Sequence, residues 1–472
     1  MKATHQRWLA GLQRHLASLL IALPLAVLTT IVPVTAQVPN TLLHTLSDPL
    51  SNSASFGSAV AISGTRVVVG TSGTNAYVYD LATAAPTVPV TALTSPCPQS
   101  GDNFGAAVAV SGVHAVVGAP GNGQGANHAG QVFVYDLLSA TPGVPVFTLT
   151  NSHPADSALG VSVAIAGAHV AAGAWQGNSA NLPRGSVHVF ELNAGAPTLP
   201  VAILTNPGPD LSFGFGLSVA ISGTRVVVGS PGDNTSGQSA GSAFVYDLAS
   251  ATPAVPVVTL TNPSPTGSTD DFGFAVAISG SRIVVGVRGD DTAAFDAGIA
   301  YVYDLASATP TVPIVTLTNP SPAANDFFGC SVALSGNLAV VGATGNDTGA
   351  DTAGIAYVFD LTRAMPTLPV ARLINPNPID FANFGGAVAV DGTTVVGARG
   401  VYVFGSAPTL SLSNSTPDSA TISWAPATSS GFLLQFTDSL TSTNWINAPT
   451  GTANPVTVPV AATSRFYRLF KP

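Results

Sequence analysis

The chain has 472 residues, a net charge of −9 at pH 7, and 8% charged residues, where an average soluble protein has about 25%. With 23 acidic residues against 14 basic ones, it lacks the basic surplus that phosphate binding needs, which argues against a nucleic-acid partner. Strand and turn residues (Thr, Ser, Asn, Gly, Asp) are abundant, and the helix formers Glu, Lys and Met are scarce.

The first 36 residues have the pattern of a secretory signal peptide. Lys2, Arg7 and Arg14 precede an apolar run, and a Val-Thr-Ala cleavage site follows, so we expect the mature chain to begin at Gln37. The alternative is an uncleaved membrane anchor, which two prolines within the run disfavour. Cleavage would leave 11 basic residues and a net charge of −12. No second apolar stretch reaches the roughly 20 residues of a membrane helix. We therefore expect a secreted or cell-surface protein without a membrane span in the mature chain.

One pattern then recurs seven times. The clearest copies read Phe-Gly-x-x-Val-Ala-Ile-Ser-Gly-x-Arg-Val-Val-Val-Gly, a Gly/Asp/Asn-rich loop, Ala-Tyr-Val-Tyr-Asp-Leu, and Val-Pro-Val-x-x-Leu-Thr-Asn-Pro. The copies begin at Phe56, Phe104, Leu159, Phe215, Phe272, Phe328 and Phe384, at spacings of 48, 55, 56, 57, 56 and 56 residues. A repeat of this size with four strand-like runs is typical of a β-propeller. We therefore predict a seven-bladed propeller over residues 37–406.

The fifth copy shows the predicted blade. Residues 275–278 and 282–285 are apolar runs joined by Ser279-Gly280, which predicts a hairpin. Residues 299–305 and 312–317 should be the third and fourth strands. The seventh copy ends after its third strand, at 401–404, and the missing fourth-strand pattern occurs at residues 42–49. We therefore expect this N-terminal strand to complete the seventh blade and close the ring, which removes an exposed sheet edge.

The repeat also predicts cross-strand neighbours, because the residue that opens the second strand should face the residue that closes the third. The expected pairs are Arg66 with Asp80, His114 with Asp136, His169 with Glu191, Arg225 with Asp247, and Arg282 with Asp304. The sixth copy departs from this pattern, with Leu338 facing Asp360. We interpret these pairs as structural contacts worth about 0.2–1 kcal/mol each.

Strands alternate in direction, so the loops between strands two and three share one face with the loops that join successive blades. Of the 22 aspartates, 14 fall in these two kinds of loop. Such an acidic loop face would attract cations or a basic partner. The alternative is that aspartate serves here as an ordinary turn residue.

The repeat resembles the FG-GAP repeat, which builds the propeller of integrin α-subunits and of many secreted bacterial proteins. The resemblance rests on Phe-Gly at the start of six copies and on Gly118-Ala119-Pro120, and it covers about residues 42–406. Departures are Leu159 in place of Phe, and Gly-Ser-Pro and Gly-Ala-Thr in place of Gly-Ala-Pro in the fourth and sixth copies. The resemblance implies extracellular recognition or adhesion, usually without catalysis.

Integrin-type repeats often hold calcium in Asp-rich loops, and calcium takes six to eight oxygen ligands. The loops that come nearest to this pattern provide the candidate metal ligands, although their spacing does not alternate as it should: Asp233, Asn234, Asp290, Asp291, Asp296, Asn346, Asp347 and Asp351. Arg288-Gly289-Asp290 spells the tripeptide that integrins recognise. Because Gly-Asp belongs to the repeat at this position, we interpret the tripeptide as chance.

No catalytic constellation is visible, since the histidines lack metal-ligand spacing and no serine lies in a Gly-x-Ser-x-Gly elbow. Residues 407–472 contain short strands between polar turns and loosely resemble a fibronectin type III-like β-sandwich module. We therefore predict an all-β, monomeric extracellular protein, not an enzyme, that binds a protein or glycan through the acidic loop face. The alternatives are a secreted carbohydrate-active enzyme with its site at the propeller channel, and a structural cell-surface component.

Overall fold

The computed structural model describes residues 21–22, 38–50, 55–96, 98–99, 101–123, 129–151, 158–175, 185–208, 214–266, 269–392, 394–397, 400–406, 409–416, 419–425, 433–438, 445–448, 455–459 and 466–470. These residues form strands and turns without a helix, so none of them belongs to a helix that could cross a membrane. The chain divides into two compact units, His44–Gly405 and Met1–Leu43 with Ser406–Pro472.

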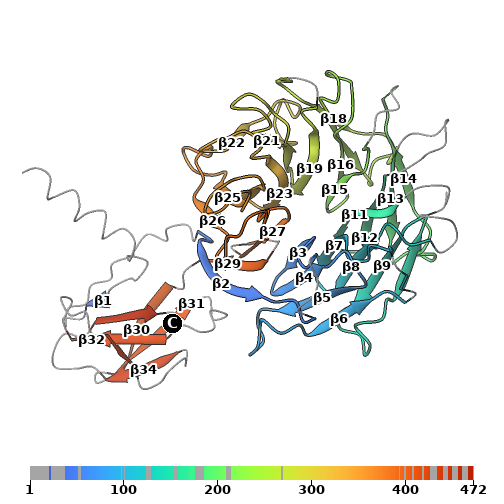
Figure 1. Cartoon of the computed structure of the whole chain (residues 1–472). Coiled ribbons are helices and arrows are strands. Elements are labelled where there is room, and N and C mark those ends of the chain that lie inside the picture. The colour runs from blue at the N-terminus through green and yellow to red at the C-terminus, as the bar shows by residue number, and fades with distance from the viewer. Residues whose placement is uncertain are drawn as a thin grey trace, which may run out of the picture. The chain divides into compact units, whose positions relative to one another are not determined.

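The larger unit is a β-propeller of four-stranded antiparallel sheets, which we call blades (Figure 1). Seven such sheets are described, one for each copy of the repeat, and the first strand of each lies toward the centre of the ring. In chain order the blades are β3 (Val60–Ser63), β4 (Arg66–Gly70), β5 (Asn75–Asp80), β6 (Thr91–Thr94); β7 (Ala107–Ser111), β8 (His114–Ala119), β9 (Gln131–Asp136), β10 (Phe147–Thr150); β11 (Leu159–Ala166), β12 (His169–Ala174), β13 (Ser186–Glu191), β14 (Ala202–Thr205); β15 (Ser218–Ser222), β16 (Arg225–Ser230), β17 (Ser242–Asp247), β18 (Val258–Thr261); β19 (Phe272–Ser279), β20 (Arg282–Val287), β21 (Ile299–Asp304), β22 (Val315–Thr318); β23 (Phe328–Ser335), β24 (Leu338–Ala343), β25 (Ile355–Asp360), β26 (Ala371–Ile374); and β27 (Val388–Asp391), β28 (Thr394–Gly397), β29 (Val401–Gly405), β2 (Thr41–Leu46).

The N-terminal strand closes the seventh blade, as the sequence predicts, because β2 lies beside β29 in the sheet order β2-β29-β28-β27. Leu46 is 2% exposed and packs in one apolar cluster with residues of the first and seventh blades, among them Val67 and Val403. Directly after β2, the carbonyl oxygen of Ser47 accepts a hydrogen bond of 2.9 Å from the Tyr79 hydroxyl of the first blade. The N-terminal strand therefore joins the two ends of the ring.

A second set of contacts links the hairpins between the first and second strands. In five of these contacts, a serine hydroxyl accepts the N–H of the hairpin glycine in the next blade, as Ser63 does from Gly112 at 3.2 Å and Ser279 does from Gly336 at 2.9 Å. Ala166 stands at the equivalent position of the third blade and has no hydroxyl to contribute. Asp391 of the seventh blade accepts the N–H of Gly64 in the first at 2.6 Å. These bonds link each blade to the next, except the third to the fourth, and link the seventh blade back to the first.

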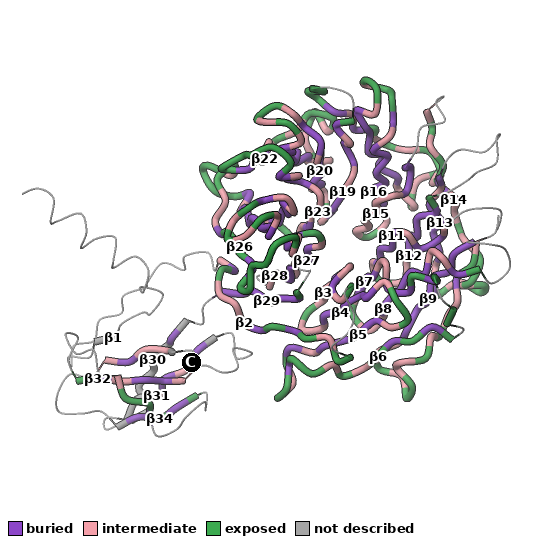
Figure 2. The backbone as a smooth tube through the Cα atoms, in the orientation of Figure 1, coloured by how far each residue is buried: buried purple, intermediate pink, exposed green. Residues whose placement is uncertain are grey.

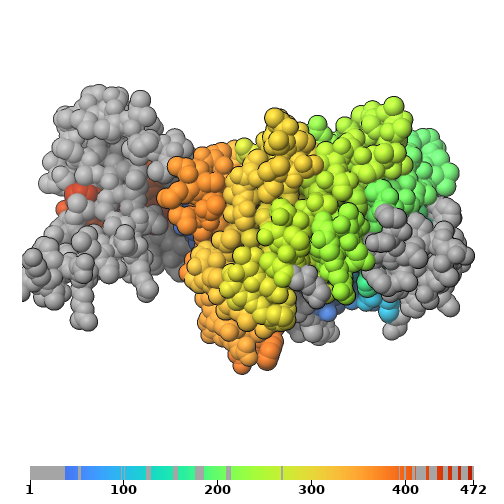
Figure 3. Space-filling view, turned by 90° about the horizontal axis from the view of Figure 1, so that it is seen from above, coloured from blue at the N-terminus to red at the C-terminus, as the bar shows by residue number. Residues whose placement is uncertain are grey.

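The Phe-Gly signature packs neighbouring blades together. Phe272 is fully buried, contacts the rings of Tyr301 and Tyr303 of its own blade at 6.2 and 6.3 Å between centroids, and shares an apolar cluster with residues of the preceding blade, among them Val227. The following Gly273 has φ +87° and lies so close to Gly229 of the preceding blade that a Cβ on Gly229 would be 2.0 Å from its carbonyl oxygen. Apolar clusters span adjacent blades in the same way, and the buried residues follow the strands while the loops are exposed (Figure 2). In the space-filling view, consecutive blades lie side by side in chain order (Figure 3).

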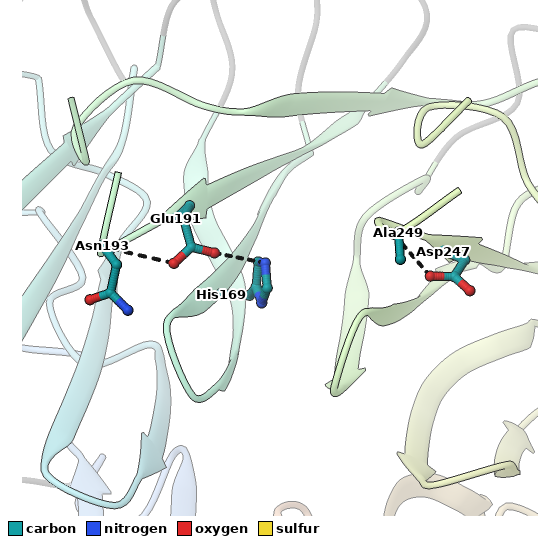
Figure 4. A network of polar contacts seen from close by, with 5 residues as sticks. All are labelled: His169, Glu191, Asn193, Asp247 and Ala249. Carbon is teal, nitrogen blue, oxygen red and sulfur yellow. Dashed lines mark hydrogen bonds and ion pairs between the residues drawn. The ribbon is translucent and has the colours of Figure 1, made fainter. Parts of the chain in front are cut away.

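All six predicted cross-strand registers are present. The expected side-chain pairing is confirmed for His169 and Glu191, whose Nε2 and Oε2 atoms lie 2.7 Å apart (Figure 4). It is wrong for the other four expected pairs, which form no ion pair within 4 Å although all their residues are described: Arg66 with Asp80, His114 with Asp136, Arg225 with Asp247, and Arg282 with Asp304. Asp247 instead accepts a hydrogen bond from the N–H of Ala249 at 3.0 Å (Figure 4). It also accepts one from the Thr224 hydroxyl at 2.8 Å, and both hydrogen bonds lower the pKa of Asp247. The carboxylate therefore caps the turn after its own strand.

The smaller unit contains two sheets. One has the order β1-β35-β32-β33 and the other β30-β31-β34. Their bounds are β1 (Ile21–Ala22), β30 (Thr409–Thr416), β31 (Ser419–Ala425), β32 (Leu433–Thr437), β33 (Ile446–Asn447), β34 (Val456–Pro459) and β35 (Phe466–Phe470). Residues from both sheets, including Trp424 and Leu434, form one buried apolar cluster. A fibronectin-like module stays a prediction, as does the signal peptide, of which only Ile21–Ala22 is described; these residues pair with Phe466 and Tyr467.

Candidate functional site

The loops between strands two and three lie against the loops that join successive blades, as the alternation of strand direction predicts. Backbone hydrogen bonds connect them: the N–H of Gly289 donates to Asp270, that of Gly345 to Asp326, and that of Phe381 to Asp351. These two kinds of loop together form the surface that we call the loop face.

The aspartates of the loop face divide into internal and exposed groups. Five of the 14 are buried: Asp102, Asp233, Asp270, Asp290 and Asp326. Asp347, Asp351 and Asp380 are exposed, four others are half-buried, and Asp156 and Asp210 lie outside the described residues. The acidic loop face predicted from the sequence is therefore less acidic at its surface than the count of residues suggests.

The buried aspartates hold neighbouring blades together through asparagine partners. The Asn319 amide donates to Asp326 at 2.6 Å, and the Asn346 amide reaches the other oxygen of the same carboxylate at 3.4 Å. At the equivalent contact in the second blade, the Asn122 amide donates to Asp102 at 3.2 Å. Since a buried carboxylate needs partners for its oxygens, these residues have a structural role.

The predicted calcium ligands cap their own loops. Asp233 accepts from the N–H of Thr235 and the Ser242 hydroxyl, and Asn346 accepts from the N–H of Thr348. In three loops a side-chain oxygen accepts the N–H five residues later: Asn234 from Ser239, Asp291 from Asp296, and Asp347 from Thr352. Asp351 accepts from the Thr352 hydroxyl, and Asp296 has φ +50°.

No group of three or more His, Cys, Asp or Glu side chains that would hold a metal ion occurs among the described residues. Calcium binding by these loops stays a prediction. The contacts of the loop oxygens support the alternative, in which Asp and Asn are turn residues.

Asp290 is the exception among the buried carboxylates. It is 1% exposed, and while one oxygen accepts the N–H of Thr292 at 2.9 Å, the other has no hydrogen-bond partner. Burial raises the pKa of Asp290, and the nearby carboxylates of Asp270 and Asp291 add to the effect. The position corresponds to Asn346 and Asn122, whose amides donate to a buried aspartate. Since Asp290 is buried, the Arg-Gly-Asp tripeptide does not present its carboxylate to a partner.

We predict that Asp290→Asn raises the melting temperature at pH 7. The new amide has a donor where the carboxylate oxygen lacks a partner, and removing such a buried charge is worth about 1–3 kcal/mol. A raised folded-state pKa means that the contribution of Asp290 to stability is fully present below the unfolded pKa of 3.8 and is lost as the pH rises through the folded value. The melting temperatures of the two proteins should therefore converge near pH 4 and separate toward pH 7.

Asp326→Asn is the matched control for this experiment. Asp326 accepts from Asn319, Asn346 and the N–H of Ala323, so replacing it removes an acceptor that is fully used. We expect this variant to melt below the wild type at pH 7. A lowered melting temperature for Asp290→Asn at pH 7 would contradict the interpretation.

Exposed aromatic and aliphatic side chains on the loop face were not predicted. Phe295 is 64% exposed, Ile379 67% and Phe381 66%, and Trp175 is also exposed. A signal for them exists in the sequence, because aligned copies carry Gln238 and Asp351 where the fifth has Phe295. A large apolar residue in one copy, where the other copies have a polar residue, could therefore have identified these side chains as exposed.

Comparison with known proteins agrees with the repeat pattern. A model of the FG-GAP repeat matches residues 90–135, 201–246, 259–303 and 314–359, each covering the fourth strand of one blade and the first three strands of the next. No curated protein matches the chain. Among solved structures, it is similar to the computationally designed Ika8 protein, with 17% identity and a TM-score of 0.44 over 77% of this chain and 99% of that chain. The β-propeller of this chain thus contains FG-GAP repeats in four places.

Proposed function

We propose that the protein is a secreted binding or adhesion protein that recognises an extracellular protein or glycan through the loop face of its propeller. The observation that carries the proposal is the contrast between the two kinds of surface. The hairpins repeat a short Ser-Gly or equivalent turn and bond to one another, whereas the loop face carries exposed aromatic residues that differ from copy to copy. Loops that vary on a rigid scaffold are the usual place for recognition.

The enzyme alternative gains no support from the strands at the centre of the ring. Among the described first strands, β3, β7, β11, β15, β19, β23 and β27, the only carboxylate is Asp391, and it is engaged with Gly64. A catalytic site in the channel would be expected to carry several carboxylates with raised pKa values. The carboxyl groups with raised pKa values, Asp290, Asp296 and Asp326, lie in the loops.

The test blocks one face at a time. With Cys97 and Cys330 replaced by serine, a single cysteine at Gln238 on the loop face or at Ala140 in a link between strands three and four is coupled to a polyethylene glycol maleimide. Both proteins are applied to arrays of glycans and extracellular-matrix proteins. We expect polymer at Gln238 to remove binding seen with the uncoupled protein, and polymer at Ala140 to leave it unchanged. Equal binding by both coupled proteins would refute recognition by the loop face.

A further inference from the structure

The loops of the fifth to seventh blades form one continuous stretch of the loop face. The N–H of Asn325 donates to the carbonyl oxygen of Phe295 at 2.8 Å, which joins the loop of the fifth blade to the next blade-joining loop. That loop in turn accepts from Gly345 at 3.1 Å, and the N–H of Phe381 donates to Asp351 at 2.8 Å. We call the exposed large apolar and acidic residues of this stretch the aromatic–acidic patch: Phe295, Asp347, Asp351, Ile379, Asp380 and Phe381.

Acidic residues outnumber basic ones in this stretch by seven to one. The four loops, residues 288–298, 319–327, 344–354 and 375–387, contain seven aspartates and one basic residue, Arg288, which pairs with Asp271 at 2.8 Å. Three of the seven are the exposed Asp347, Asp351 and Asp380, and the N–H of Asp351 donates to the Asp380 carboxylate at 3.3 Å. The carboxylates therefore lie close to Phe381, and among the described residues no basic side chain forms an ion pair with these three, since Arg288 pairs with Asp271.

Phe381 is an unfavourable residue for its position in two respects. Its phenyl ring is 66% exposed, and its backbone has φ +59°, a left-handed conformation in which a bulky side chain is strained. The aligned residue of the preceding blade, Asn325, adopts φ +64° and belongs to a type that tolerates this conformation. The fold therefore accommodates asparagine here without an exposed ring. Strain kept at an exposed position points to a role in binding.

We propose that the aromatic–acidic patch binds a basic segment of a protein, in which lysine or arginine residues alternate with apolar ones. The inference rests on the proposed function and specifies its partner. Exposed rings take both apolar side chains and cations, arginine most often, and the neighbouring carboxylates attract the same cations. An anionic glycan would be repelled by these carboxylates, and a neutral glycan would make no use of their charge.

The test measures fluorescence anisotropy with two labelled peptides of twelve residues, one alternating Arg and Leu and the other alternating Glu and Leu. We expect the full chain to bind the Arg–Leu peptide at least about tenfold more tightly than the Glu–Leu peptide, and rising salt to weaken this binding. Phe381→Asn should weaken it at least about tenfold, as expected when an aromatic anchor is removed. Its melting temperature should be unchanged or higher, because asparagine fits the left-handed backbone.

Two further variants separate the contributions. Asp347→Asn with Asp351→Asn keeps the loop-capping oxygens and should weaken Arg–Leu binding while reducing its dependence on salt. Val312→Asn removes an exposed apolar residue from a link between strands three and four and should leave the affinity unchanged. Binding of Phe381→Asn equal to that of the wild type, or no preference for the Arg–Leu peptide, would overturn the proposal.

The two experiments distinguish a failure of the proposed partner from a failure of the proposed loop-face function. If polymer at Gln238 removes binding to an arrayed ligand that Phe381→Asn retains, the loop face binds and the patch proposal fails. If Phe381→Asn loses an arrayed glycan but binds the Arg–Leu peptide as before, the partner is a glycan and the choice of a basic protein segment is wrong.

Discussion

Gly286→Ala is expected to destabilise the propeller by at least about 3 kcal/mol, the upper range for overpacking a core. A Cβ at this position would lie 2.0 Å from the carbonyl oxygen of Gly329 in the next blade. Because that oxygen belongs to the backbone, the clash is relieved only if two blades move apart. The same 2.0 Å approach recurs between Gly342 and Gly385, so the repeat requires it. Thermal unfolding should show a melting temperature lower by about 5 °C or more.

Gly195→Ala is the control for this substitution. Gly195 lies in a turn where no atom is within 4 Å of the position that a methyl group would take, and its φ is not positive, so alanine should change stability by no more than about 0.5 kcal/mol. If the two variants melted at the same temperature, the close approach of glycines would not be what holds the blades at their spacing.

The period of the repeat was sufficient to predict the strand pairing. The register of Arg282 with Asp304 follows from the recurring ends of the second and third strands, although the loop that joins them varies in length. The closing strand follows from the absence of a fourth strand in the seventh copy. Strand ends were less accurate: β22 begins at Val315, whereas the pattern predicted Val312, because the Pro-x-x-Pro link continues to Ile314.

The directions of polar side chains were not predictable from the same pattern. Asp247 faces Arg225 across the strands but accepts hydrogen bonds from its own turn, since an N–H two residues away is nearer than a long and flexible guanidinium. The burial of Asp290 was also hidden, because Asp, Asn and Gly occur interchangeably in surface turns. The exposed Phe381 was missed for another reason. A comparison of repeats emphasises what the copies share, and this residue is informative because it differs.

Removal of the N-terminal strand is expected to open the ring. We compare the protein from residue 37 to 472 with one that begins at residue 55 and so lacks β2. Loss of Leu46 alone should cost about 2–5 kcal/mol, as for other buried leucines, and the backbone bonds to β29 are lost as well. The exposed edge of β29 becomes a template for pairing with a second chain. The shorter protein should therefore melt at a lower temperature and form oligomers in size-exclusion chromatography.

Adding the missing strand as a peptide separates closure from a general effect of truncation. A peptide of residues 38–49 should restore the melting temperature and the monomeric elution of the shorter protein, with a dependence on peptide concentration that follows its affinity for the open ring. The same peptide with Leu46→Asp is the control, because the buried cluster of Leu46 with Val67 and Val403 has no partner for a carboxylate. Rescue by both peptides, or unchanged stability without β2, would show that the ring does not depend on the N-terminal strand. Rescue by the native peptide alone would establish that the ring without β2 is otherwise folded. It would also show that β2, added as a separate segment, is enough to join the seventh blade to the first.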